Sequence, residues 1–142
     1  MNKAVMSREQ FLLWLAGFID GDGTIGIGGD VRWQVVRLRL INTSADLLKY
    51  IQSKVGGHLG EQGSPVGKGK QVYCLTLSPN ETEEVLFLIG PYLRLKYEQA
   101  RLALEFQETK VYEGSHSGVP YEVLRRRKEI GDALNELNRR GV

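Results

Sequence analysis

Two carboxylates, Asp20 and Asp22, stand at the end of an apolar stretch and are the side chains best placed to do chemistry. Residues 7–10 read Ser-Arg-Glu-Gln, which fits a capping box and predicts a helix over 7–21. The last carbonyls of a helix carry partial negative charge, so two anions there are unfavourable without a cation. A divalent ion held by carboxylate and carbonyl oxygens meets that need, and such hard ligands suit Mg²⁺, Mn²⁺ or Ca²⁺. The alternative is that both acids are turn residues beside Gly21 and Gly23.

The predicted helix is apolar nearly all the way round, so we expect it to be buried on more than one side. One of its stripes consists of Leu13, Gly17 and Gly21. A glycine inside a helix costs about 1 kcal/mol relative to alanine, which is tolerable where another backbone must come very close. These three residues therefore predict an interface with a second helix.

Residues 15–23 read LAGFIDGDG and resemble the motif that names the LAGLIDADG homing endonucleases, departing from it at Phe18 and Gly21. In that family the motif helix pairs with a copy of itself, and the second acid of the motif binds the catalytic metal. The resemblance therefore implies that Asp22 and the Gly21 carbonyl bind the metal and that Asp22 is catalytic. Asp20 is expected to finish the helix or shape the turn. Because the family also includes RNA-splicing maturases and non-cutting relatives, the motif predicts the fold more directly than the activity.

Two further site residues follow from the resemblance. Residues 91–96 read PYLRLK, similar to the segment that delivers a lysine to the active site in single-motif members, and Lys96 is the matching position. Such a lysine would stabilise charge on the scissile phosphate or polarise the attacking water, whereas the alternative is a helix-surface lysine. Asn42 falls where the family often places an amide that orients metal-bound water, and it could instead be a helix cap.

Length and composition predict one domain spanning 1–142. The family resemblance implies a core over about 7–111, followed by a helical extension over about 119–140. The net charge of +2 does not by itself indicate nucleic acid. Cys74 is the only cysteine, which excludes an internal disulfide and a multi-cysteine zinc site and favours a small buried residue. No apolar run approaches a membrane span and the start lacks a signal-peptide core, so we expect an intracellular protein with no membrane partner.

The order of elements predicts an α+β protein. Strands are expected over 23–27, 31–41, 58–62 and 70–77, with a loop at 63–69. Helices are expected after the caps at 42–44 and over 79–89, from Pro91 to about 111, and over 121–140. Each half of the core repeats an α-β-β unit. The family resemblance implies an αββαββα core with a four-stranded antiparallel, saddle-shaped sheet on DNA, followed by C-terminal helices.

Alternation along 31–41 puts Val36, Leu38 and Leu40 on one face and Arg37 and Arg39 on the other, which predicts one core face and one basic face. The predicted DNA contacts are Thr24, Arg32, Arg37, Arg39, Gln62, Lys68, Lys70, Gln71 and Tyr73. Trp14 and Trp33 are interpreted as packing residues. Trp33, however, alternates with the outward-facing positions of the predicted strand and could lie over DNA. The charge run at 125–128 is either solvated or near phosphate.

Two weaker patterns are excluded. Residues 21–26 satisfy G-x-G-x-x-G, but they follow a helix and enter a strand, the reverse of the dinucleotide-binding order. Residues 20–31 begin like an EF-hand loop, yet Ile25 and Val31 stand where glycine and glutamate are required.

The predicted function is a homodimeric, double-strand DNA endonuclease that cuts a long pseudo-palindromic site with a divalent metal. One chain supplies one Asp22, and cutting both strands needs two such sites, so two chains must pair through Leu13, Gly17 and Gly21. Mg²⁺ is the expected cofactor, with Mn²⁺ as a substitute and Ca²⁺ supporting binding without cleavage. The alternatives are a maturase-like protein with RNA as partner and a non-catalytic DNA-binding dimer.

Overall fold

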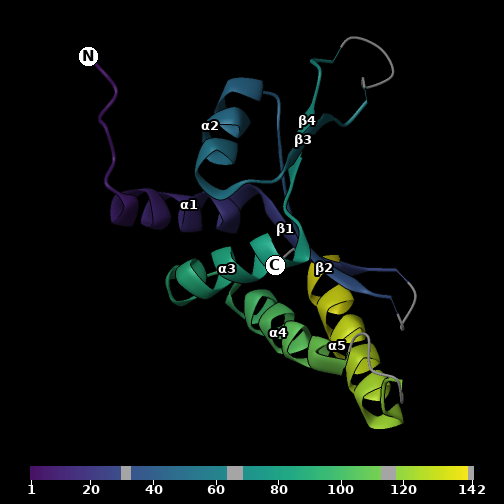
Figure 1. The fold of residues 1–142 in the computed structure, drawn as a ribbon. Helices are drawn as coiled ribbons and strands as arrows, with labels where there is room; N and C mark the ends of the chain where they lie inside the picture. Colours follow the sequence, from purple (N-terminus) through teal and green to yellow (C-terminus); the bar gives the residue numbers. More distant parts are fainter. Residues whose placement is uncertain (30–32, 64–68, 113–117, 141–142) are drawn as a thin grey trace.

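The computed structural model describes residues 1–29, 33–63, 69–112 and 118–140 of the chain (Figure 1). The elements, in chain order, are α1 (Arg8–Asp22), β1 (Gly23–Gly28), β2 (Val35–Asn42), α2 (Ala45–Val55), β3 (His58–Glu61), β4 (Tyr73–Thr76), α3 (Pro79–Ile89), the 3₁₀ turn η1 (Gly90–Tyr92), α4 (Tyr97–Glu108), the 3₁₀ turn η2 (Thr109–Tyr112) and α5 (Tyr121–Arg139). Within these residues, no helix is long and apolar enough to cross a bilayer. The α+β order predicted from the sequence is confirmed.

The starts of α1 and α2 follow the predicted caps. Ser7 caps α1 with a complete capping box, because its side chain accepts from the Gln10 backbone and the Gln10 side chain accepts from the Ser7 backbone. Ser44 caps α2, and Ser78 with Glu81 forms a second capping box at α3. The longer helix expected after Pro91 begins only at Tyr97, since Pro91 lies in η1.

The four strands form one antiparallel sheet in the order β1-β2-β4-β3. Three strands are shorter than the sequence predicts. The second strand begins at Val35 rather than at 31, and Trp33 lies in a turn before it. Since β3 ends at Glu61 and β4 begins at Tyr73, the predicted strand residues Gln62, Lys70 and Gln71 lie outside both strands. A backbone hydrogen bond from the Gln62 N–H to the Val72 carbonyl (2.8 Å) nevertheless extends the pairing of the β3-β4 hairpin beyond the ends of the two strands.

The two faces of the sheet differ as the alternation predicts. Ile25, Val36, Leu38, Leu40 and Leu75 are at most 1% exposed and join apolar side chains from all five α-helices in one cluster. Trp14 packs there as expected, against Phe18 and Tyr50, and Cys74 is buried. The helices therefore cover one face of the sheet and leave the positions of opposite parity facing outward.

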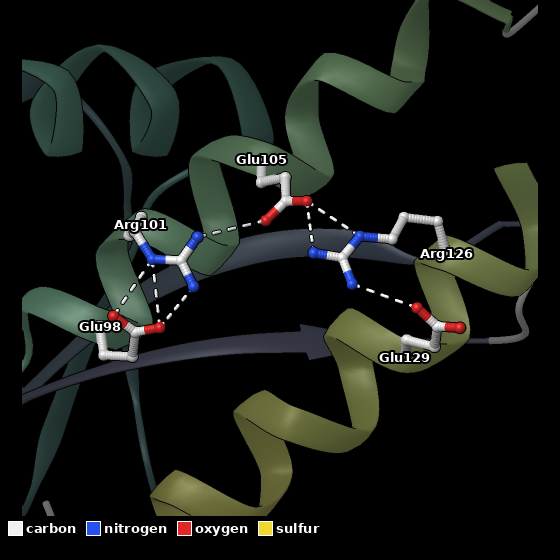
Figure 2. A network of polar contacts seen from close by, with 5 residues as sticks. All are labelled: Glu98, Arg101, Glu105, Arg126 and Glu129. Atoms are coloured by element: carbon white, nitrogen blue, oxygen red, sulfur yellow. Dashed lines mark hydrogen bonds and ion pairs between the residues drawn. The ribbon is translucent and has the colours of Figure 1, made fainter.

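The last helix, α5, is held against α4 and β1. Figure 2 shows how Arg126 on α5 reaches Glu105 on α4, which also pairs with Arg101, while Arg101 pairs with Glu98 and Arg126 with Glu129. These side chains are 30–52% exposed, so each pair contributes at most about 1 kcal/mol. The amide of Asn138 on α5 also donates to the Ile25 carbonyl of β1 (2.9 Å).

The charge run at 125–128 has a structural role that neither sequence interpretation anticipated. Arg127 is 0% exposed, donates to the Thr109 hydroxyl and carbonyl at 2.9 Å each, and lies over the Phe106 ring. Arg125, Arg126 and Lys128 are exposed and paired with carboxylates. The run therefore fastens α5 onto the end of α4.

Candidate active site

The site is built where α1 passes directly into β1. Gly23 ends α1, and its N–H donates to the Ile19 carbonyl. A Cβ at Gly23 would lie 2.9–3.0 Å from Ile19 side-chain and backbone atoms, so only glycine allows the strand to leave the helix this closely. This tight exit fixes Asp20 and Asp22, in the last turn of α1, beside the start of the sheet.

Asp20 does not finish its own helix, so that expectation is wrong. Its carboxylate reaches the segment before α4 and accepts three backbone N–H groups, from Arg94 (2.8 Å), Leu95 (3.1 Å) and Lys96 (3.0 Å). A carboxylate that accepts several backbone donors is strongly fixed in place. Asp20 therefore joins α1 to a segment more than 70 residues away in the chain.

Lys96 lies at the C-terminal end of α1, next to both acids. Its ammonium donates to the carbonyls of Ile19 and Asp20, at 3.1 Å each. Burial lowers the pKa of Lys96, while the Asp20 and Asp22 carboxylates act in the opposite direction. The side chain is thus a cation at the negative end of a helix dipole, and it supplies part of the compensation that the sequence argument assigned to a metal alone.

Asp22 differs from Asp20 in that its carboxylate is exposed and has no hydrogen-bond partner among the described residues. Its carboxylate oxygens and the nearby Gly21 carbonyl are hard donors, which fit a divalent cation such as Mg²⁺. No group of three or more histidine, cysteine or acidic side chains lies close together in the described parts of the chain.

Asn42 ends β2 close to this site, because it lies two residues beyond Leu40, the partner of Gly23 in the sheet. Its side-chain oxygen accepts the Ser44 N–H at 2.8 Å, just before α2. This bond supports the helix-start role that the sequence also allowed. A water-orienting role for the amide stays a prediction.

The outward face of the sheet brings together part of the predicted DNA-binding set. Thr24, Arg39, Thr76 and His58 are paired across the four strands in one row. Arg37 is exposed opposite Gly26, and Arg39 donates to the Gln62 side chain at 3.0 Å. No acidic residue occupies an outward position in the strands that the structure describes. This face is therefore basic and polar.

The remaining predicted contacts lie elsewhere. Tyr73 shares the parity of Leu75 and packs against the core, so it faces the helices rather than the arginines, which contradicts its placement in the DNA-binding set. The Gln71 side chain donates to the Gly63 and Val72 carbonyls, and Lys70 is exposed. Arg32 and Lys68 lie outside the described residues. Trp33 is 73% exposed, so its packing interpretation is wrong.

The small-residue stripe of α1 is uncovered within this chain. Leu13 is 43% exposed, Gly17 and Gly21 are exposed, and a Cβ at either glycine would meet no other atom within 4 Å. The three positions are four residues apart and so lie along one side of α1. The structure thus leaves room for another backbone along this side.

No protein-family model and no curated protein matches the sequence. Among solved structures, the homing endonuclease I-CvuI in complex with a DNA target is 26% identical, with a TM-score of 0.67 over 91% of this chain and 82% of that one. The archaeal intron-encoded homing endonuclease I-Vdi141I, complexed with DNA, is 15% identical, with a TM-score of 0.72 over 92% and 86% of the two chains.

A third structure, the LAGLIDADG homing endonuclease I-GzeII with its DNA target, is 16% identical, with a TM-score of 0.70 over 93% of this chain but only 45% of that one. The fold of this chain is that of the LAGLIDADG homing endonucleases, and α1 carries their motif. The motif occurs once, and the chain spans most of I-CvuI and I-Vdi141I. The family resemblance predicted from residues 15–23 is confirmed.

Proposed function

We propose that this protein is a site-specific, divalent-metal-dependent DNA endonuclease that acts as a homodimer. The observation that carries the proposal is the exposed Asp22 carboxylate at the end of α1, where the Lys96 ammonium binds the Ile19 and Asp20 carbonyls and the Asp22 charge raises the Lys96 pKa. It adjoins a sheet face whose described strands carry no outward acid. Solved neighbours with this fold are homing endonucleases in complex with DNA targets, which supports the same partner here.

The dimer follows from the number of sites. One chain presents one Asp22, while double-strand cleavage needs an acidic site for each strand. Pairing through the open stripe of Leu13, Gly17 and Gly21 would bring the C-terminal ends of two α1 helices together. Two copies of Asp22 would then lie close to the two-fold axis, one for each DNA strand.

The chemistry divides among the residues at the end of α1. Asp22 and the Gly21 carbonyl would hold Mg²⁺ or Mn²⁺, which when bound supplies an activated water and stabilises the leaving 3′ oxygen. The Lys96 ammonium places positive charge where the scissile phosphate gains negative charge. Asn42 is proposed to orient water through its amide nitrogen. The I-CvuI complexes were studied in the presence of Mg, with a target that was not cleaved, and in the presence of Ca, with another target, in line with divalent-metal use.

The DNA would lie along the outward sheet face. Arg37 and Arg39 are proposed to contact guanine or phosphate, and Gln62 to contact adenine or to hold Arg39 in position. Thr24, Lys70 and Gln71 extend this surface, and Arg32 and Lys68 remain predictions. The face can read a long site because each subunit presents two hairpins to the major groove.

The test is cleavage of a randomised duplex library by the purified protein in Mg²⁺, followed by sequencing of the cut ends. One recurrent, pseudo-palindromic site is expected. Asp22→Asn should abolish cutting while binding of that site in Ca²⁺ persists, because the change removes the charge that holds the metal. Asp132→Asn on the exposed side of α5 is the matched control and should cut normally. Wild-type protein that binds structured RNA but never cuts a duplex would favour the maturase function instead.

A further inference from the structure

Asp20 holds Lys96 from two directions. Its carboxylate accepts the Lys96 backbone N–H at 3.0 Å, and its backbone carbonyl accepts the Lys96 ammonium at 3.1 Å. The same lysine is therefore bound at its main chain and at its tip by one residue. This leaves little freedom in the position of the ammonium relative to α1.

The segment before α4 depends on this contact. Lys96 is the N-cap residue of α4, yet its own side chain makes no capping hydrogen bond. The Asp20 carboxylate takes up the N–H groups of Arg94, Leu95 and Lys96, which directly precede the helix. A carboxylate from α1 therefore fixes the segment that leads into α4, whereas α1, α2 and α3 each begin at a serine that caps the helix itself.

The position of the ammonium is not what stability alone would select. A lysine can normally extend its charge into water, whereas this side chain is partly buried and its ammonium is turned onto the Ile19 and Asp20 carbonyls, at 3.1 Å each. A charge held partly buried beside an exposed Asp22 is the arrangement expected of a group set in place for chemistry.

We propose that Asp20 is a positioning residue, which acts on cleavage by holding Lys96 beside Asp22 rather than by binding the metal. This proposal rests on the endonuclease function proposed above. It replaces the sequence-based expectation that Asp20 finishes the helix or shapes the turn. Asparagine keeps the size of the side chain, but it removes the charge and presents an NH₂ group to a cluster of N–H donors.

A double-mutant cycle tests the proposal, with single-turnover cleavage measured in Asp20→Asn, Lys96→Met and the combined variant. Asp20→Asn alone should slow cleavage by about 10- to 100-fold, the usual effect of misplacing a catalytic group. In the Lys96→Met background the same change should alter the rate by less than about twofold, because no ammonium remains to be positioned. DNA affinity in Ca²⁺ should stay within about twofold throughout. Equal effects of Asp20→Asn in both backgrounds, or none, would overturn the proposal.

A second measurement separates this proposal from the endonuclease proposal, since it needs neither DNA nor metal. Asp20→Asn should speed amide hydrogen exchange at residues 94–96 by more than about tenfold and raise acylation of Lys96 relative to the exposed Lys49. Asp132→Asn should change neither. Faster exchange and labelling in a protein that cuts no duplex would retain the positioning role and reject the nuclease. Unchanged exchange and labelling would reject the positioning role whatever the protein cuts.

Discussion

Replacing Gly17 by alanine should change the stability of this protein in opposite directions at low and at high concentration. Within one chain, a Cβ at Gly17 meets nothing within 4 Å. Alanine in a helix interior is favoured over glycine by about 1 kcal/mol, so the isolated monomer should gain about 1 kcal/mol and melt about 3 °C higher. If a second α1 packs there, the added methyl group would instead push the paired backbones apart.

The dimer should lose more than the monomer gains. Inserting a methyl group into a closely packed contact costs about 1 to 3 kcal/mol. Because each subunit carries the change, the dimer loses about 2 to 6 kcal/mol, and its dissociation constant should rise by about 30- to 20,000-fold. Gly21→Leu, at the next position of the stripe, should prevent dimerisation at micromolar concentration. Both effects are measured by sedimentation equilibrium and by melting over a range of protein concentrations.

Gly131→Ala is the matched control, since it also adds a methyl group to a helix and its Cβ would make an ordinary 3.6 Å contact with Gln34. It should leave the dimer unchanged. An unaltered dimer in Gly17→Ala and Gly21→Leu would place the interface elsewhere, and a wild-type protein that stays monomeric at every concentration would refute the dimer itself.

Three further predictions address the sheet face, a helix cap and the buried arginine. If Arg39 reads guanine, Arg39→Ala should weaken DNA binding by about 1 to 3 kcal/mol and relax the preference for one base in each half-site. If Arg39 contacts phosphate, the same change should reduce the slope of log binding constant against log salt concentration by about one. Unchanged binding in a gel-shift titration would place the DNA on another surface. Hydrogen bonds from Ser78 and Gly57 lower the pKa of Glu81 from its usual 4.5, so Glu81→Gln should lower the free energy of unfolding by about 1 kcal/mol at neutral pH. That difference should disappear as the pH falls through the lowered pKa, and urea titrations showing it undiminished below that pH would contradict the assignment. Arg127→Met should lower the free energy of unfolding by about 3 kcal/mol, since it leaves the Thr109 carbonyl and hydroxyl without their donor; a loss below about 1 kcal/mol would show that the contacts contribute little.

The start of a helix was predictable from the sequence where the capping residues lie within one turn of it. The capping box at Ser7 and the cap at Ser44 lie where the sequence predicts them, because a cap needs only residues within one turn. The capping box of Ser78 and Glu81, before the helix predicted over 79–89, was not identified. Strand ends were less predictable. Alternation gave the faces of β2 correctly, but pairing decides where a strand begins, and pairing with β1 starts only at Val35.

Arg127 shows a signal in the sequence that was missed. Ile130 and Leu134 are buried on α5, and Arg127 lies on the same side at helical spacing. A charged residue on an apolar stripe predicts a buried, partnered group. Reading residues 125–128 only as a charge run hid that position among three exposed neighbours.

The contact between Asp20 and Lys96 could not be read from the sequence, because 76 residues separate them and no local pattern couples them. The sequence did carry the physical problem, namely two acids at the negative end of a helix. The structure compensates the charges of the two acids differently. Asp20 is held by three N–H donors, with Lys96 beside the helix end, whereas Asp22 keeps an exposed carboxylate without such a partner. A carboxylate saturated with protein donors has little capacity left for a metal, and an unsaturated one retains it. The two acids therefore have separate tasks, with Asp20 fixing the site and Asp22 left available for the cation.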